Sequence, residues 1–344
     1  MPVKTISIVT PTYNSIRTLS LYMDAIITQD YPHEAIEVVF VDGGSTDGTL
    51  EAIEEYKAKY KTKITVFHNP LITAEAGKAL GVRNAANDIV CLLDSDNIIP
   101  YPSWLTLMMK PFEEEEIVAS EPVEYTYRKE DSIINRYCAL AGVNDPICIF
   151  SGNYDRFCRI TNKWTQMPHE EIDKGDYLSV RFEAKKLPTI GANGFFMRRH
   201  EILESFEGDY LFDIDILYEL FSKKPNLRAA KVKTGIIHLY CPDIKTFARK
   251  QRRRIKDFLY FSSTNGRKYQ WNAVGKWKII LFVLCTVTLL PLLVQAVIGF
   301  SRKPDFSAWS FHIAACWITV YVYSLETIIS LFKKEAMNRK EWKQ

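Results

Sequence analysis

Two carboxylates one residue apart follow the apolar run VCLL at residues 90–93, where Asp94 and Asp96 flank Ser95. An apolar run that ends in such acids predicts a strand that leaves its sheet into a loop. Mg²⁺ and Mn²⁺ prefer carboxylate oxygens, keep several waters and complete their coordination with oxygens of a substrate diphosphate. The pattern therefore indicates either a metal site for a nucleotide diphosphate or an ordinary solvated turn, and its surroundings must decide.

Two further segments carry groups suited to a nucleotide. In VDGGSTDGT at residues 41–49, Asp42 ends a second apolar run, where its carboxylate can accept hydrogen bonds from a nucleobase or ribose. In EAGKALGVRNAA at residues 75–86, Lys78 and Arg83 lie on a predicted helix and can direct cations at phosphates. For either cation, an ordinary surface charge is the alternative interpretation.

These segments belong to an alternating pattern of strands and helices. Strand-like runs at 6–9, 38–41, 64–67 and 89–93 alternate with helical patterns at 15–27, 49–61 and 74–86. This order predicts an α/β fold with an open, mainly parallel sheet and helices on both faces. Because ligands of such sheets bind beyond the carboxyl ends of the strands, we expect residues 10–13, 42–47 and 94–97 to converge.

The middle of the chain is less regular. Residues 101–190 predict insertion loops or short helices over the site. Small residues return in GANG at 191–194, where Asn193 and Gly194 would let a ligand approach the backbone closely. His238 ends a strand-like run near the same edge. It is a candidate third metal ligand or diphosphate contact, and a structural histidine is the alternative interpretation.

Composition bounds the class of protein. The chain has 344 residues, of which 47% are hydrophobic, and a formal net charge of +3, which excludes a disordered protein. Its seven cysteines form no CxxC pair and predict a reducing compartment without a zinc site. The first residues enter a strand-like run at once, so no signal peptide is predicted.

The C-terminal part predicts attachment to a membrane. Residues 244–278 contain eleven Lys or Arg and one acid, Asp257, a pattern typical of basic amphipathic helices on anionic lipid. Residues 279–300 and 311–332 are apolar runs that would reach about 33 Å as helices, enough to cross a bilayer. Two buried core helices are the alternative.

The flanking charges predict an orientation. Basic residues precede the first run and fill the tail at 333–344, whereas the connecting loop has only Arg302 and Lys303. By the positive-inside rule, we predict a two-helix transmembrane hairpin over 279–332 with both termini in the cytoplasm. A catalytic domain over 1–243 would then also be cytoplasmic.

Six motifs occur in order along residues 7–255. They are SIVTPTYN (7–14), VVFVDGGSTDGT (38–49), GKALGVRNAA (77–86), LLDSDN (92–97), GANGFFMRR (191–199) and KQRRRI (250–255). With these motifs the chain resembles the inverting family 2 glycosyltransferases, which have the GT-A fold. The resemblance implies that a sugar is transferred from a nucleotide-diphosphate donor with inversion at the anomeric carbon.

The resemblance also implies roles for residues. Pro11, Thr12 and Tyr13, together with Asp42, would hold the base and ribose. Asp94 and Asp96, with Ser95 between them, would hold the diphosphate and a Mn²⁺ or Mg²⁺ ion. The segment KQRRRI resembles the QxxRW segment of membrane polysaccharide synthases, with Ile255 in place of Trp. Gln251, Arg252 and Arg253 are therefore expected near the donor diphosphate or an acceptor phosphate, and long-chain polymerisation is disfavoured.

Inverting transfer to a hydroxyl needs a general base within about 3 Å of the acceptor oxygen. In the family this base is usually an Asp in a Glu-Asp or similar pair after the GANG turn. The corresponding stretch here, YLFDIDILYEL at 210–220, departs from that pair. We predict Asp215 as the base and Asp213 as the second choice, although either acid could instead cap the helix that begins near Ile214.

Three functions remain open on the sequence. The first is a membrane-bound glycosyltransferase that acts on a hydroxyl of a lipid-linked or envelope glycan. The second is a polyprenyl-phosphate glycosyltransferase resembling dolichol-phosphate-mannose synthase. Ile98 argues against it, because that group usually has a further polar ligand at this position. The third is a catalytically silent nucleotide-sugar-binding membrane protein. Expected partners are the donor, the acceptor and the bilayer, with no nucleic acid, and a homo-oligomer stays open.

Overall fold

The computed structural model describes residues 3–191, 193–264, 266–270 and 275–332. The chain divides into two compact units. Unit 1 combines Met1–Thr126 with Pro168–His238, and unit 2 combines Tyr127–Met167 with Leu239–Gln344. The predicted catalytic segment 1–243 is thus interrupted, because residues 127–167 pack with the C-terminal part of the chain.

Unit 1 is built on a mixed ten-stranded sheet. Its strands are β1 (Ile6–Thr12), β2 (Ile36–Asp42), β3 (Lys63–His68), β4 (Ile89–Leu92), β5 (Asn97–Ile98), β6 (Ile117–Tyr125), β7 (His169–Asp173), β8 (Tyr177–Phe182), β9 (Phe195–Arg198) and β10 (Arg228–His238). Their order across the sheet is β3-β2-β1-β4-β9-β6-β10-β8-β7, and β5 pairs with the end of β10.

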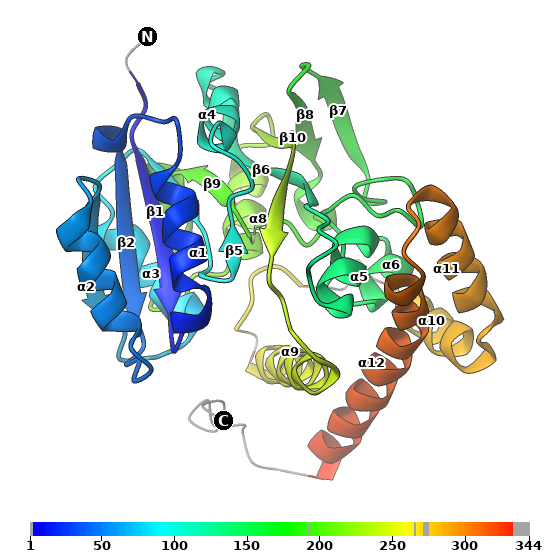
Figure 1. Ribbon diagram of the computed structural model, residues 1–344. Helices are drawn as coiled ribbons and strands as arrows, with labels where there is room; N and C mark the ends of the chain where they lie inside the picture. The colour runs from blue at the N-terminus through cyan, green and yellow to red at the C-terminus, as the bar shows by residue number, and fades with distance from the viewer. Residues whose placement is uncertain (1–2, 192, 265, 271–274, 333–344) are drawn as a thin grey trace. The chain divides into compact units, whose positions relative to one another are not determined.

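The first half of the sheet follows the predicted pattern. β1, β2 and β4 are almost entirely buried, as the apolar strands of a parallel sheet covered on both faces must be. Helices α1 (Ile16–Ile27), α2 (Thr49–Lys59) and α3 (Ala74–Asn84) connect the strands. The connection from β3 to β4 runs back across the sheet, so right-handed crossovers place α3 on the face opposite α1 and α2 (Figure 1).

Strand direction decides where the site residues meet. β1, β2 and β4 are parallel, β9 runs antiparallel to β4 and β6, and β10 is parallel to β6. Consequently β1, β2, β4, β6 and β10 all end at one edge of the sheet, and β9 begins there. This edge carries Thr12, Asp42, Asp94, Asn193 and His238.

Residues 101–190 are more regular than their sequence predicts. The central strand β6 has the sequence IVASEPVEY, in which Glu121 and Pro122 interrupt the apolar pattern by which a buried strand is recognised. The remaining elements of unit 1 are η1 (His33–Ala35), α4 (Trp104–Met109), η2 (Lys110–Glu113), η3 (Ala184–Lys186), α7 (Arg199–Ser205) and α8 (Asp213–Lys223).

Unit 2 is helical. Its helices are α5 (Ile133–Ala141), α6 (Ile147–Ser151), α9 (Ile244–Thr264), α10 (Lys276–Thr288), α11 (Leu290–Arg302) and α12 (Phe306–Phe332). Tyr137, Phe247 and Trp309, from α5, α9 and α12, share one buried core. The basic stretch that begins at residue 244 forms the single helix α9 through its first 21 residues.

The C-terminal helices match the predicted hairpin only in part. Among the described residues, α12 is the one continuous helix long and apolar enough to cross a bilayer. The expected straight helix over 279–300 is instead two helices, α10 and α11, bent by 89°. Pro291 has no N–H, and its ring clashes with the carbonyl four residues earlier, so a regular helix cannot continue through it. The predicted basic tail at 333–344 lies outside the described residues.

Candidate functional site

A cation and two acids form the centre of the strand-end edge. The Lys78 ammonium, in the first half of α3, lies 3.0 Å from Oδ2 of Asp213 at the start of α8. Asp94, just beyond β4, is close enough that its charge acts on both groups. Oδ1 of Asp94 and Oδ1 of Asp213 are buried without a hydrogen-bond partner. These two oxygens are the natural acceptors for a ligand proton or a cation.

The environment of Asp213 suits a general base. Burial raises the pKa of Asp213 to about 6, while the Lys78 ammonium acts in the opposite direction and favours the carboxylate. Gly191 packs directly on this acid, because a Cβ at residue 191 would lie 2.3 Å from Cβ of Asp213. The φ of Gly191, +118°, also requires glycine. Gly191 of the GANG segment therefore abuts Asp213.

The two predicted base candidates have different surroundings. Asp213, the second choice, is the acid bonded to Lys78. Asp215 follows two residues later in the first turn of α8 and is buried. Two residues advance an α-helix by about 200°, so the two carboxylates leave α8 on nearly opposite sides. The described contact with Lys78 favours Asp213, and its role as the base stays a prediction.

A second cluster lies at the ends of β5, β6 and β10. Oδ2 of Asp96 is 3.6 Å from Nε2 of His238. The His238 ring lies 5.4 Å from that of Tyr125. The Tyr125 hydroxyl in turn accepts a hydrogen bond of 2.9 Å from the amide of Asn193. Three predicted residues, Asp96, His238 and Asn193, are therefore linked, with Tyr125 as a member that the sequence did not indicate.

The side chains of Asp94, Asp96 and His238 suit a metal ion that also binds oxygens of the substrate. Among the residues that the structure describes, no three His, Cys, Asp or Glu side chains are grouped to hold a metal ion alone. Asp94 offers an unpaired buried oxygen, and Asp96 and His238 offer an oxygen and a nitrogen close together. A hard divalent ion keeps waters and substrate oxygens among its ligands, so such a sparse set suits a metal–diphosphate complex.

The loops after β1 and β2 are tied together around Asp42. Oδ1 of Asp42 accepts from the backbone N–H groups of Gly44 and Ser45, each at 2.8 Å. Its Oδ2 accepts from the hydroxyls of Ser45 and Thr12, at 2.6 and 3.0 Å. Four donors saturate a carboxylate. Asp42 thus organises this loop. For Asp42 to contact a nucleotide directly, as the sequence predicts, the nucleotide must displace one of these donors.

The other predicted donor-site residues surround these loops. Tyr13 is a largely exposed aromatic ring beside Thr12, and Pro11 packs against Gly77 at the start of α3. The Ser95 hydroxyl donates to Ser15 at 2.9 Å and so fixes the loop after β4 to the start of α1. Gly194, with φ +82°, donates its N–H to the Leu92 carbonyl. The exposed ring suits stacking on a nucleobase.

Arg83 has its contacts elsewhere in unit 1. Its guanidinium lies 5.0 Å from the centre of the Phe206 ring and donates to the Gly208 carbonyl. It also approaches Asp209 at 4.0 Å. Arg83 sits in the last turn of α3, whereas Lys78 lies on its second turn. Of the two predicted cations, the structure brings only Lys78 to the acids through its described contacts.

The predicted segment 251–253 belongs to unit 2, where its side chains bind the unit itself. The Gln251 amide donates to the Asn144 carbonyl at 2.8 Å. Arg252 pairs with Glu326 of α12 at 2.8 Å, and Arg253 approaches Asp257 at 3.9 Å. Of these contacts, the Arg252–Glu326 pair joins α9 to α12. A role at the donor diphosphate stays a prediction.

Sequence reasoning missed a fully buried ion pair beneath the GANG turn. Nζ of Lys231 in β10 is 2.5 Å from Oε1 of Glu121 in β6, and both side chains are excluded from solvent. The other oxygen, Oε2 of Glu121, accepts from the Gly191 N–H at 3.4 Å. The pair therefore supports the backbone that packs on Asp213. The signals in the sequence were the charged residues Glu121 and Lys231 within mainly apolar runs.

Removing one member of this pair is expected to be costly. Glu121→Gln leaves a buried ammonium without its counter-charge and should lower the free energy of unfolding by about 3–5 kcal/mol, measured by urea denaturation. The double variant Glu121→Leu with Lys231→Met should recover most of that loss. The exposed pair Glu183–Lys186 is the control, because Glu183→Gln should cost less than about 1 kcal/mol. Equal effects at both pairs would contradict this account.

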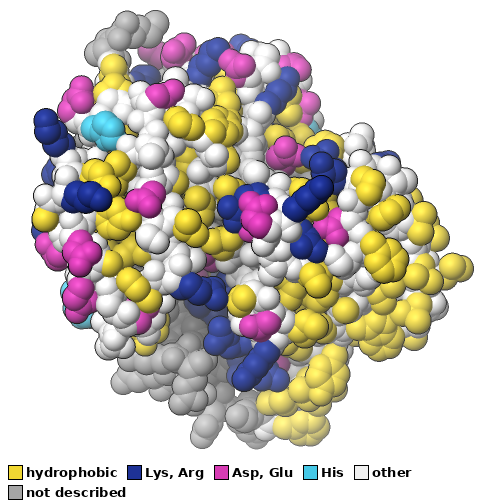
Figure 2. Space-filling view, in the orientation of Figure 1, with side chains coloured by type: hydrophobic (Ala, Val, Ile, Leu, Met, Phe, Trp, Pro, Cys, Tyr) yellow, Lys and Arg dark blue, Asp and Glu magenta, His cyan; other side chains and the backbone are white. Residues whose placement is uncertain are grey.

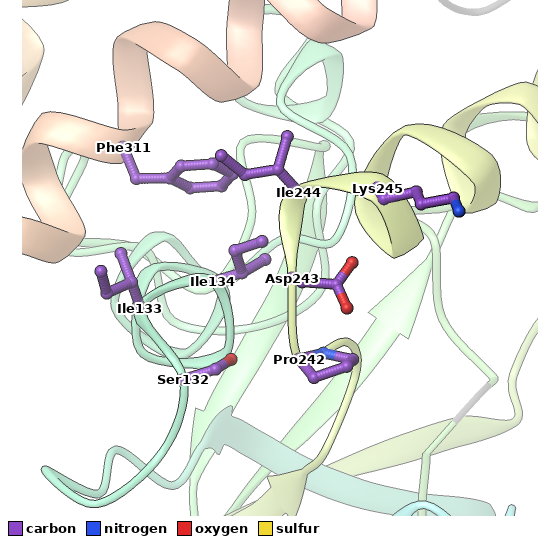
Figure 3. A pocket seen from close by; sticks show the side chains of 8 residues that line it. All are labelled: Ser132, Ile133, Ile134, Pro242, Asp243, Ile244, Lys245 and Phe311. Atoms are coloured by element: carbon purple, nitrogen blue, oxygen red, sulfur yellow. The ribbon is translucent and has the colours of Figure 1, made fainter.

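Unit 2 carries a groove of about 590 Å³. Figure 3 shows Phe311 and Ile244 facing one another across it, with the Lys245 ammonium directed away. Its other lining residues are Ser132, Ile133, Ile134, Pro242 and Asp243. The lining is mostly apolar, so the groove offers none of the acid pairs that mark the edge of unit 1.

Parts of the sequence match known glycosyltransferases. Over 133 residues, 38% of this chain and 43% of the relative, the sequence is 26% identical to glycosyltransferase AglE of Haloferax volcanii. Over 93 residues, 27% of this chain and 16% of the relative, it is 31% identical to the poly(ribitol-phosphate) beta-N-acetylglucosaminyltransferase TarS of Staphylococcus aureus. The matches thus span less than half the length of either relative.

A solved structure and a family model extend these matches. Mannosyltransferase PcManGT from Pyrobaculum calidifontis, solved with GDP-Man and Mn²⁺, superposes with a TM-score of 0.51 at 15% identity, covering 94% of this chain and 88% of that one. This likeness confirms the predicted GT-A-like mixed sheet. The sequence model of Glycosyl transferase family 2 matches residues 7–206, more than half of the 344 residues. The chain belongs to glycosyl transferase family 2.

Proposed function

We propose that this chain is a membrane-bound inverting hexosyltransferase that uses a nucleotide-diphosphate sugar. Its acceptor would be a hydroxyl of a lipid-linked or envelope glycan. The observation that carries the proposal is the meeting of Lys78, Asp94 and Asp213 at one edge of the sheet. A cation for phosphate, an acid for a metal and an acid with a base-like pKa are the groups that inverting transfer needs.

The residues divide the chemistry between them. The Asp213 carboxylate would take the proton of the acceptor hydroxyl as its oxygen attacks the anomeric carbon, and the nucleoside diphosphate would leave with the bonding electrons. Lys78 would bind a diphosphate oxygen and hold Asp213 in its ionised form. Asp94, Asp96 and His238 would hold a Mn²⁺ or Mg²⁺ ion, which neutralises charge on the leaving diphosphate when bound.

The acceptor class is supported by two observations. The relative TarS is named for transfer to poly(ribitol-phosphate), an acceptor with free hydroxyl groups. Unit 2 presents apolar helices and the basic helix α9, which suit a membrane surface with anionic lipid. We propose that both termini and unit 1 lie in the cytoplasm, in keeping with the free cysteines among the described residues.

A panel of nucleotide sugars tests the proposal. Purified full-length protein with Mn²⁺ should transfer sugar from one of UDP-glucose, UDP-N-acetylglucosamine or GDP-mannose to a membrane glycan extract, and NMR should show the product with inverted anomeric configuration. Retained configuration would exclude the mechanism. Donor binding without turnover on any acceptor would instead identify a catalytically silent nucleotide-sugar-binding protein.

The same assay addresses the polyprenyl-phosphate alternative. There the acceptor is already an anion and needs no general base. Transfer to bare polyprenyl phosphate that survives Asp213→Asn would favour that function over the one proposed. The described contacts around Asp213 and Lys78 favour transfer to a hydroxyl.

A further inference from the structure

The bent pair α10–α11 is too short in each arm to cross a membrane. Each helix has 13 residues, and so a length of about 20 Å, against a hydrocarbon thickness of about 30 Å. The arms meet at 89° beside Leu289 and Pro291. A membrane segment with this shape either bends within a span or enters and leaves on the same side. The contacts at its two ends decide between these.

Both ends of the bent pair bind one short segment of unit 2, from the last residue of α6 to residue 160. Near the start of α10, the Lys278 ammonium donates to the Ser151 carbonyl at 2.6 Å. At the end of α11, the Arg302 guanidinium donates to the Arg159 and Ile160 carbonyls, each at 2.8 Å. The part of this segment that follows α6 folds back on itself, because the hydroxyls of Tyr154 and Thr161 are 2.5 Å apart. The two ends therefore lie on the same side of the bend.

The turn between α11 and α12 is held in the same way. Asp305, at the start of α12, accepts from the Tyr127 hydroxyl at 2.9 Å and from Arg136 of α5 at 2.8 Å. Tyr127 follows the last residue of the central strand β6 by only two positions. A hairpin that crossed the bilayer would carry Asp305 to the far side, away from Tyr127 and α5 of its own unit. The bond to Tyr127 is incompatible with that placement.

The far end of α12 is also held by polar groups of unit 2. Glu326 pairs with Arg252 of α9 at 2.8 Å, and Tyr323 donates to Asp145 at 2.5 Å. Between these ends, His312 contacts the Tyr137 hydroxyl at 2.9 Å. These contacts follow one face of α12 at helical spacing. Its length from Asp305 to Glu326, about 32 Å, therefore runs along unit 2 and not away from it.

The surfaces of α10, α11 and α12 that face away from these contacts are apolar and exposed. On α10 and α11 they include Ile280, Leu284, Val287, Leu290 and Val297, the last two about two-thirds exposed at 66% and 67%. On α12 they are Phe306, Trp317, Tyr321, Ile328 and Leu331. Figure 2 shows hydrophobic side chains covering the surface over α10, α11 and α12. An apolar surface of this kind, with aromatic rings and a basic helix in the same unit, suits a lipid leaflet.

We propose that unit 2 is a monotopic membrane anchor. The bend of α10–α11 enters one leaflet, α12 lies along the interface with its apolar face in the lipid, and no segment of the described residues crosses the bilayer. This replaces the two-span hairpin predicted from the sequence. The inference rests on the membrane attachment proposed above and specifies its geometry. Its occupant is a bilayer that contains anionic lipid.

The location of residue 301 separates the two topologies. Ser301, in the last turn of α11, is exposed. Full-length Ser301→Cys and, in unit 1, Asp209→Cys are labelled with a membrane-impermeant maleimide in sealed vesicles, with the unchanged chain as background for its native cysteines. The monotopic anchor predicts that both variants are labelled from the same side. Labelling from opposite sides until detergent opens the vesicles would establish the hairpin and overturn the inference.

Vesicle flotation tests the attachment itself. Leu290→Glu with Val297→Glu should reduce binding to phosphatidylcholine–phosphatidylglycerol vesicles at least about tenfold, because an acid in the leaflet is costly. Leu71→Glu, an exposed apolar residue of unit 1, is the matched control and should bind as the unchanged chain does. If the unchanged chain does not float with vesicles, both the anchor and the proposed membrane attachment are wrong. If it floats and residue 301 is on the far side, only the anchor geometry is wrong.

Discussion

Asp213→Asn is expected to lower kcat for sugar transfer about 10²–10⁴-fold and to leave the Kd of the nucleotide sugar within a few-fold of its original value. The reason is that an amide cannot accept the proton of the acceptor hydroxyl, whereas the donor is held by other groups. Single-turnover kinetics with a titration of donor binding would measure both quantities. Asp215→Asn is the matched control, since that acid leaves the same helix on the other side.

The reverse pattern would contradict the assignment. If Asp215→Asn abolished transfer and Asp213→Asn did not, the contact with Lys78 would be structural and the base would be Asp215. Circular dichroism of both variants distinguishes loss of chemistry from loss of the fold.

The pH dependence gives an independent test of the same residue. The base must be ionised, so kcat/KM should fall as the pH drops below the Asp213 pKa of about 6. Lys78→Met removes the cation that opposes the raised pKa of Asp213. The fall of kcat/KM on the acidic side of the pH profile should therefore move to higher pH. If the acidic side of the kcat/KM profile does not shift in Lys78→Met, a group other than Asp213 controls it.

Asp96→Asn and Asp94→Asn are each expected to remove most of the Mn²⁺-dependent turnover and to weaken Mn²⁺ binding in the presence of nucleoside diphosphate. A neutral amide is a poorer ligand for a hard divalent ion than a carboxylate, and loss of charge here weakens stabilisation of the leaving diphosphate. Electron paramagnetic resonance of Mn²⁺ with UDP or GDP reports binding without turnover.

Asp88 supplies a control, because it flanks the same strand, β4, as Asp94 does. Asp88, exposed just before β4, lies at the end opposite Asp94, so Asp88→Asn should bind Mn²⁺ normally. Undiminished Mn²⁺ binding and activity in both Asp94→Asn and Asp96→Asn would exclude the metal site.

Much of unit 1 could be predicted from the sequence because its signals are local. The strands at the start of the chain are short apolar runs, and the alternation of strand and helix fixes their parallel order within right-handed crossovers. That order alone brings Asp42 and Asp94 to one edge of the sheet. The motif at 92–97 could thus be read as a site before any distance was known.

Other features depend on partners distant in the chain. Lys78 and Asp213 are 135 residues apart, and no local pattern shows that Asp213, and not Asp215, faces the cation. The strand β6 was hidden because its Glu121 looks unsuited to a buried strand until Lys231 is placed beside it. Arg83 was chosen as a phosphate ligand from its helix alone, whereas the loop at 206–209 binds it.

The sequence by itself determined the family through its ordered motifs. It also determined the parallel half of the sheet and the edge where its acids converge, because these follow from residue periodicity and short connections. Only the tertiary structure decided which acid pairs with Lys78 and how the C-terminal helices run. Hydropathy measures how apolar a segment is, and residues 279–300 are apolar enough to span. Their path is set instead by Pro291 and by the hydrogen bonds of Lys278, Arg302 and Asp305 to distant parts of unit 2.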